Sequence, residues 1–226
     1  MISPIAVFVL IALVVGLIAF LGWWFSDDQR AKRAMRGVPK RSIADVIEGE
    51  RARIVGAVEV PEPLTAPLSG RPCAAWRVTV EERRRSGKNS YWKKIVDEHE
   101  AVEFFLTDGT GKARVEQVIV KPVLAHDARG GSGFLNDPTP ELQAFLADRG
   151  HDTQGWVFNK TIRFREGVAE PGEEVAVVGT GRWERDPDEK ARAGSGYREA
   201  AMPKRLVMQP SEGGSLLLSD EHDVLG

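Results

Sequence analysis

Residues 4–25 form a run of 22 consecutive residues without a charged side chain, and a basic stretch follows them. A helix rises about 1.5 Å per residue, so a helix of this length would cross the roughly 30 Å hydrocarbon core of a bilayer. Trp23, Trp24 and Phe25 close the run, and such aromatic residues prefer the headgroup level. The run therefore predicts a single transmembrane helix as an anchor within residues 1–26.

Two other interpretations of this run fit the sequence less well. A cleaved signal peptide needs a basic start, an apolar core of roughly 7–15 residues and a small-residue cleavage site. Here Met1-Ile2-Ser3 carries no basic side chain, and the run ends in Gly-Trp-Trp-Phe. A helix on a protein core normally keeps one polar face, which this run lacks.

The basic stretch after the run sets the expected orientation. Its basic residues are Arg30, Lys32, Arg33, Arg36, Lys40 and Arg41, and only Asp27 and Asp28 oppose them. Lys and Arg close to a membrane segment tend to stay in the cytoplasm. We therefore predict a single-pass protein of the cell membrane, with its N-terminus outside and its C-terminal domain cytoplasmic. Residues 27–41 are expected to be a juxtamembrane linker that is able to contact anionic lipid headgroups.

The rest of the chain, residues 42–226, is mildly acidic and nearly free of cysteine. Its net charge of −6 argues against broad nucleic-acid binding, because a nucleic-acid interface needs a basic face. About 185 residues suit one domain with a sizeable core. Cys73 is the only cysteine, so an intrachain disulfide is excluded, which fits a reducing compartment.

Local patterns in this part predict mostly short strands joined by turns. Trp76, Val78 and Val80 alternate with polar residues, which is typical of a half-buried strand. A loop at 86–90 predicts a hairpin, and Asp-Gly in 108–111 predicts a second. The expected strands are 50–60, 76–81, 91–96, 102–106, 113–120, 161–165, 175–183, 205–209 and 216–219.

The other segments are expected to be loops and short helices. Thr139-Pro140 opens a predicted helix that ends near Gly150, and residues 42–45 predict one short turn of helix. Four prolines within 61–72 indicate a shaped loop or a sheet edge. The fold class predicted for the whole chain is an N-terminal transmembrane helix plus a mainly-β, barrel- or sandwich-like α+β soluble domain with one or two short helices.

Several strings occur in an order that resembles the GIDE domain, also called BAM for "beside a membrane". They are Pro67-Leu-Ser-Gly-Arg-Pro-Cys73 before a strand, Phe105-Leu-Thr-Asp-Gly-Thr-Gly111, Glu166-Gly-Val-Ala-Glu-Pro-Gly172 and Val175-Ala-Val-Val-Gly179. The resemblance covers roughly residues 43–219. It implies kinship with the membrane RING-type E3 ubiquitin ligases of eukaryotes and with membrane-anchored bacterial and archaeal relatives.

This chain departs from the ligases in two respects. A RING finger binds two zinc ions through Cys and His, and one cysteine with four scattered histidines cannot build that site. The eukaryotic members place the domain between two membrane segments, whereas this sequence holds a single apolar run. The resemblance therefore does not carry ligase activity to this chain.

Cys73 and the histidines are the first candidates for chemistry. Cys73 would need a base and a lowered pKa to act as a nucleophile, and no histidine is placed beside it by the sequence. Burial as a small apolar residue is therefore the preferred interpretation. His99, His126, His151 and His222 lack the spacing of metal ligands. His99 lies among acidic residues, which would suit a weak metal site or a solvated strand edge. We therefore assign no catalytic, metal-binding or cofactor-binding residue, and no cofactor.

A basic hairpin tip is the other candidate feature. Residues 83–88 read Arg-Arg-Arg-Ser-Gly-Lys, and Lys93 and Lys94 follow. The tip could reach phosphates or anionic lipid, or it could be a solvated turn that blunts edge pairing. The glycine-rich strings at 108–111 and 130–133 lack the phosphate-loop pattern.

The sequence thus predicts a non-catalytic binding domain for an unknown protein or peptide partner. The expected binding modes are a groove beside an exposed strand edge or a barrel face. Two alternatives remain open: a ubiquitin-ligase-related protein by descent, and a structural domain that assembles with itself.

Overall fold

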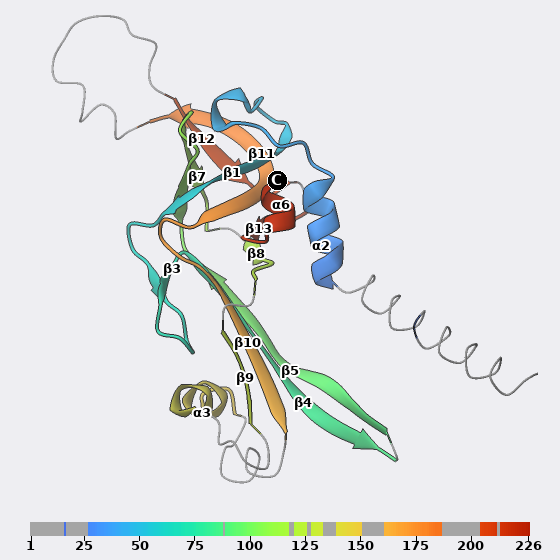
Figure 1. Cartoon of the computed structure of the whole chain (residues 1–226). Coiled ribbons are helices and arrows are strands. Elements are labelled where there is room, and N and C mark those ends of the chain that lie inside the picture. Colours follow the sequence, from blue (N-terminus) through green and yellow to red (C-terminus); the bar gives the residue numbers. More distant parts are fainter. Residues whose placement is uncertain are drawn as a thin grey trace, which may run out of the picture.

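The computed structural model describes residues 16, 27–87, 89–117, 120–125, 128–132, 139–150, 161–186, 204–211 and 213–226. These residues form a seven-stranded sheet, a four-stranded sheet and a two-stranded hairpin (Figure 1). The strands are β1 Arg51–Glu59, β2 Leu64–Thr65, β3 Pro72–Cys73, β4 Ala75–Ser86, β5 Asn89–Ala101, β6 Phe104–Thr107, β7 Lys112–Val115, β8 Val120–Pro122, β9 Ala128–Ser132, β10 Ile162–Ala169, β11 Glu174–Arg185, β12 Lys204–Gln209 and β13 Leu216–Ser219. The described helices are α2 Asp27–Arg36, η1 Ile43–Asp45, α3 Pro140–Ala147 and α6 His222–Leu225.

Five strands of the larger sheet close into a barrel. Their order is β1-β6-β7-β12-β11, and β11 pairs with β1 to complete the ring. The β7–β12 pair is parallel and the other four pairs are antiparallel. Numbered along the chain, the barrel strands pair as 1-2-3-5-4-1, which is the connectivity of an OB-type barrel. Strands β13 and β8 extend the sheet beyond β11.

The four-stranded sheet is built from two long insertions into this barrel. Strands β4 and β5 lie between barrel strands β1 and β6, whereas β9 and β10 lie between β7 and β11. They pair in the order β5-β4-β10-β9. Neither insertion can form the sheet alone, so its existence depends on the barrel bringing the two together.

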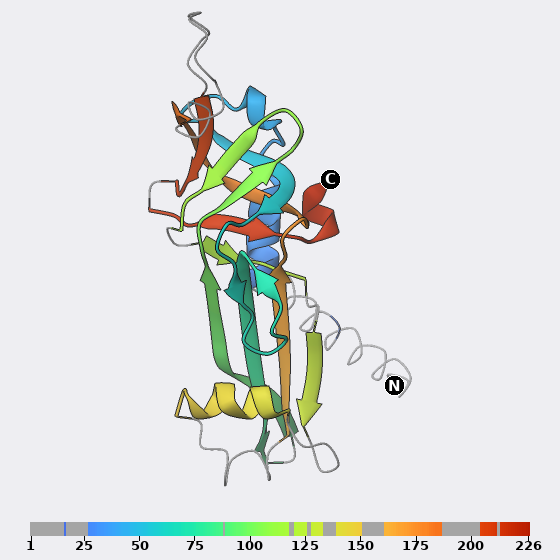
Figure 2. The same ribbon diagram turned by 90° about the vertical axis from the view of Figure 1, so that its left-hand side faces the viewer.

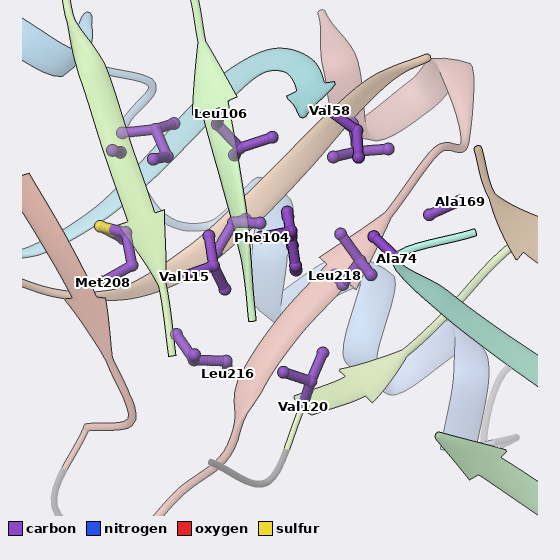
Figure 3. Close-up of a cluster of buried hydrophobic side chains, with 14 of the residues drawn as sticks. Val58, Ala74, Phe104, Leu106, Val115, Val120, Ala169, Met208, Leu216 and Leu218 are labelled. Atoms are coloured by element: carbon purple, nitrogen blue, oxygen red, sulfur yellow. The ribbon is translucent and has the colours of Figure 1, made fainter. Parts of the chain in front are cut away.

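The barrel interior is filled by alternate apolar residues of its strands. Phe104, Leu106 and Met208 have no exposed surface, and Figure 3 shows them in one cluster, with Val115 between Met208 and Phe104. The same cluster continues to Ala74 and Ala169 at the start of the second sheet. The alternation predicted for Trp76, Val78 and Val80 is confirmed in β4, where these three side chains are buried and the residues between them are partly exposed.

Helix α3 covers one face of the four-stranded sheet (Figure 2). Its residues Leu142, Phe145 and Leu146 pack into the cluster that contains Trp76 and Val78. Thr139 caps the helix because its side-chain oxygen accepts a hydrogen bond from the Leu142 amide. This helix, its cap and its buried face agree with the sequence-based prediction.

Residues 27–41, which we expected to be a basic linker, are instead part of the folded domain. Helix α2 buries Met35 completely, and it contacts β13 and α6. Lys32 forms an ion pair with Glu221 at 2.7 Å and Arg36 forms one with Asp223 at 3.4 Å. Apolar residues spaced for one helix face explain the packing, and the acidic C-terminal helix neutralises part of the basic stretch.

The predicted transmembrane helix is the main correction to the fold class. Among the described residues, no helix is long and apolar enough to cross a membrane. The α-helices α2, α3 and α6 have 10, 8 and 4 residues, and at 1.5 Å per residue the longest of them spans only about 15 Å. Apart from Gly16, the apolar run 4–25 lies outside the described residues.

The fold class is therefore corrected to a mainly β protein with a closed five-stranded barrel and few helices. The described residues contain no transmembrane helix, so that part of the prediction is not borne out in them, and the mainly-β part with short helices agrees with the structure. The predicted cell-membrane location and orientation stay predictions, because both depend on residues outside the described part of the chain.

Strand ends account for the smaller differences. The expected strand 113–120 is two separate strands, β7 and β8, and its residues 118–119 lie outside the described chain. The proline-rich segment 61–72 contributes to the small β2–β3 hairpin. Strand β10 runs four residues further than expected, to Ala169, because it pairs with β4 along its full length.

Candidate binding surface

Cys73 lies in the core and is not placed to act as a nucleophile. Its side chain has no exposed surface, and the Sγ–H donates a weak hydrogen bond to the Leu64 carbonyl at 3.8 Å. Burial, together with the negative charge of Glu166, raises the pKa of the thiol to about 11. The thiol is therefore neutral at physiological pH, as the packing interpretation of Cys73 requires.

Glu166 explains the proline-rich string that precedes Cys73. Its carboxylate is fully buried and accepts hydrogen bonds from the amides of Leu68 and Ser69 at 2.8 and 2.9 Å. Gly70 adopts a φ of 70°, which closes the loop so that its amide bonds the Ala66 carbonyl. The string therefore builds a loop anchored on β10, and its role here is structural.

The histidines do not converge on a metal site. His99 lies exposed on β5 opposite Arg77, and partial burial and the Arg77 charge lower its pKa. His222 belongs to α6, whereas His126 and His151 lie outside the described residues. Within the described ranges, no group of three His, Cys, Asp or Glu side chains is arranged to hold a metal ion.

The Asp-Gly-Thr-Gly string forms a turn that also supports η1. Asp108 accepts hydrogen bonds from the amides of Ile43, Thr110 and Gly111 at 2.7, 2.8 and 3.1 Å. Partial burial alone would raise the pKa of Asp108, but these bonds lower it. Gly109 has a φ of 83°, as the predicted tight turn requires.

The outer face of the barrel at β6, β7 and β12 carries a network of ion pairs. Arg114 forms ion pairs with Glu103, Glu116 and Glu184 at 2.9 to 3.2 Å, and Arg205 shares Glu184. OB-type barrels bind extended ligands near this face. Here three glutamates surround the two arginines, so this cluster offers no excess positive charge to an anionic partner.

A two-stranded ribbon extends beyond the four-stranded sheet. Strands β4 and β5 pair from Ala75–Ala101 out to Ser86–Asn89, whereas β10 pairs with β4 only as far as Glu82. Residues 83–86 and 89–92 thus form a hairpin end beyond β10, and Lys93 and Lys94 follow directly, opposite Glu82 and Glu81. We call residues 83–86 and 89–94 together the arm. Figures 1 and 2 show this hairpin pointing away from the barrel.

The arm combines exposed aromatic and basic side chains. Tyr91 is 50 % exposed and Trp92 is 36 % exposed. In the strand register Trp92 lies opposite Arg83 and Tyr91 lies opposite Arg84. Since side chains alternate along a strand, one face carries Arg83, Arg85, Trp92 and Lys94, and the other carries Arg84, Tyr91 and Lys93.

Neighbouring residues hold part of this surface in place. The Arg163 guanidinium stacks on the Trp92 ring at 4.3 Å and also pairs with Glu81 at 2.5 Å. The Arg83 guanidinium donates to the Ser90 hydroxyl at 3.0 Å. Within the described part of the chain, the exposed Arg85 and Lys93 form no ion pair.

The base of the arm is tied to helix α2. Arg77 donates two hydrogen bonds to Asp97, at 2.9 and 3.1 Å, and one to Asp28 of α2 at 2.7 Å. Partial burial alone would raise the pKa of Asp97, but the bonds from Arg77 and Lys94 lower it. This ionic network fixes the direction in which the hairpin leaves the domain.

Strand β5 is also the edge strand of its sheet. It is 13 residues long and pairs with β4 on one side. A hollow of about 400 Å³ lies against its second half, lined by Trp76, Asp97, Glu98, His99, Glu100 and Arg149. Among the described residues, β5 therefore has one edge without a partner strand, and the use of this edge in binding stays a prediction.

Sequence reasoning found the basic hairpin tip but missed its neighbours. It placed Tyr91 and Trp92 in a strand without recognising that both are exposed. It also missed Arg163, which lies far away in sequence and reaches Trp92 only through the β10–β4 pairing. The signal in the sequence was the position of two adjacent aromatic residues close to a charged turn. A strand end that extends beyond its sheet has no core in which such residues could be buried.

Comparison with known proteins identifies no relative of this chain. No protein-family model matches it, and no curated protein or solved structure matches it significantly. The resemblance to the GIDE domain stays a prediction from the sequence. Nothing in the comparisons supports the GIDE or ligase-like descriptions, no described helix supports the transmembrane one, and the β-rich description is the part that fits the structure.

Proposed function

We propose that this protein is a non-catalytic binding domain that engages an anionic partner through the β4–β5 arm. The observation that carries the proposal is the composition of the arm, where exposed basic side chains surround Tyr91 and Trp92. Tyr, Trp and Arg are the residues that most often contribute strongly to protein interfaces. The excess positive charge of the arm indicates that the partner is negatively charged.

The geometry of the arm supports the same proposal. A two-stranded ribbon without a third strand or a covering helix is marginally stable in water. The domain nevertheless holds the arm at its base through Arg77 and through the stacking of Arg163 on Trp92. A ribbon that is braced at its base and exposed along its length is well suited to contact another molecule.

Charge reversal within the arm tests this proposal. The double variant Arg85→Glu/Lys93→Glu removes the two exposed cations that have no ion pair among the described residues. The matched control is Arg51→Glu/Arg182→Glu, which changes the net charge equally at two exposed positions of the barrel. Elution of each full-length protein from heparin resin along a salt gradient is the measurement.

We expect the wild type and the barrel control to elute at similar salt concentrations and the arm variant to elute at a clearly lower one. Circular dichroism should show the same β-rich spectrum for all three proteins. Equal shifts for the arm variant and the barrel control would mean that only net charge matters, and the proposal would then be abandoned.

A further inference from the structure

We infer that the anionic partner is an extended acidic polypeptide segment that adds to the outer edge of β5 as a third strand. This inference rests on the proposed function and specifies the class of partner and the way in which it binds. The segment would lie along residues 89–94 of the arm.

The main chain of β5 provides the first argument. Strand β5 occupies the edge of its sheet and pairs with β4 on its inner side. All six residues from 89 to 94 are exposed. An edge strand presents a row of N–H and C=O groups that an extended peptide can pair with. A third strand would also convert the marginal two-stranded ribbon into a three-stranded sheet.

The side chains of the arm provide the second argument. Cross-strand neighbours lie roughly 4.5–5.5 Å apart at Cβ, so a carboxylate on an added strand would come within ion-pair reach of Lys93 or Lys94. Both faces of the ribbon carry cations, with Lys93 on one and Arg85 and Lys94 on the other. Acidic side chains would therefore be favoured on either face of the added strand.

The same geometry disfavours two other occupants. A second copy of this segment in parallel register would bring the lysines of both copies together, and like charges in direct opposition destabilise a pair of strands. An antiparallel copy would place Lys93 and Lys94 opposite Ser90 and Asn89, which supply no carboxylate. A flat anionic lipid surface would meet only one face of the ribbon at a time. An added strand lies in the plane of the ribbon and reaches the side chains of both faces.

A β-bulge limits the length of the proposed site. The β4–β5 register shifts between Val80 and Glu81, so that Val96 and Lys94 are partners of consecutive residues. A bulge bends the strand and interrupts a regular edge. Beyond it the charge of the edge changes sign, with Asp97, Glu98 and Glu100. An acidic strand would therefore pair along about six residues, from Asn89 to Lys94.

The inference is tested by measuring the binding of synthetic peptides to the full-length protein. The probes are three fluorescent nine-residue peptides with blocked ends: alternating Glu and Thr, alternating Lys and Thr, and the Glu-Thr peptide with N-methylated threonine amides. The N-methylated peptide keeps the charge but cannot donate these backbone hydrogen bonds. Anisotropy titrations report binding, and amide hydrogen exchange of residues 89–94 reports its location.

We expect the Glu-Thr peptide alone to bind and to slow exchange along residues 89–94. The Arg85→Glu/Lys93→Glu variant should weaken this binding by about tenfold, whereas Arg51→Glu/Arg182→Glu should leave it unchanged. Equal binding of the N-methylated peptide, or no binding of any peptide, would overturn the inference.

Vesicles of phosphatidylglycerol and phosphatidylcholine provide the lipid comparison. Exchange within the arm is the informative readout, because it separates binding at the arm from lipid contact elsewhere in the full chain. If these vesicles slow amide exchange in the arm and the Glu-Thr peptide does not bind, the inference is wrong and the partner is a lipid surface. If heparin retention still depends on the arm while all peptides fail, the inference falls and the proposed function stands.

Discussion

Replacing Glu166 tests whether its buried carboxylate organises the loop at residues 66–71. The carboxylate is fully buried and accepts two backbone hydrogen bonds, from Leu68 at 2.8 Å and Ser69 at 2.9 Å. A hydrogen bond to a charged group contributes about 1.5–3 kcal/mol net. Glu166→Ala removes both bonds, so we expect a loss of about 3–6 kcal/mol in the free energy of unfolding.

Glu166→Gln should have a smaller effect. Glutamine keeps one carbonyl oxygen for one amide, but its NH₂ group faces the other amide as a second donor. About one charged hydrogen bond is lost, so the expected change is about 1.5–3 kcal/mol. The control is Glu170→Gln, which removes the partly exposed ion pair with Arg71 and should cost less than about 1 kcal/mol.

Urea unfolding followed by tryptophan fluorescence measures these differences, because Trp76 packs in the same cluster as Cys73. Amide exchange should also become faster at Leu68 and Ser69 in both Glu166 variants. If Glu166→Ala stays within 0.5 kcal/mol of the wild type (about the size of an ordinary surface substitution), or if the glutamine variant is the less stable one, the proposed role of the carboxylate is wrong.

Two further predictions concern the buried thiol and a crowded glycine. The pKa of Cys73 is raised from 9.0 to about 11 in the folded protein, so its contribution to stability is complete below pH 9 and is lost as the pH rises toward 11. Cys73→Ala should therefore flatten the fall in the urea midpoint over this range, and an unchanged slope would contradict the raised pKa. A Cβ atom at Gly167 would lie 2.4 Å from the Ala125 carbonyl oxygen and 2.7 Å from the Leu124 Cβ, so Gly167→Ala should cost at least about 1–3 kcal/mol. Gly37→Ala, where the nearest atom is 3.4 Å away, is the control in the same urea assay, and equal stability of the two variants would refute the steric argument.

Elements that depend on neighbours in sequence were predictable. The alternation in β4, the Asp-Gly turn before β7 and the capped helix α3 follow from residues a few positions apart. Helix α2 was missed because its apolar residues are few and its many charges suggested a linker. The transmembrane prediction depended on the length of the uncharged run and its closing aromatic residues, and the helices that the structure describes are short.

The candidate binding surface shows the same division. The basic residues of the arm were visible in the sequence, and so was the hairpin that carries them. Their exposure was not, because it depends on β10 pairing with β4 only as far as Glu82. The stacking of Arg163 on Trp92 joins residues 71 positions apart, and no local pattern indicates such a contact.

By itself, the sequence determined the mainly β character, the single thiol and the turns, because each follows from composition or from the conformational preferences of adjacent residues. The tertiary structure alone decided that five strands close into a barrel, that two distant insertions form one sheet and that β5 lies at its edge. Strand pairing depends on which segments meet in space, and the free energy of that choice is distributed over the whole core. The edge position of β5, on which the proposed binding mode depends, is a property of the complete fold.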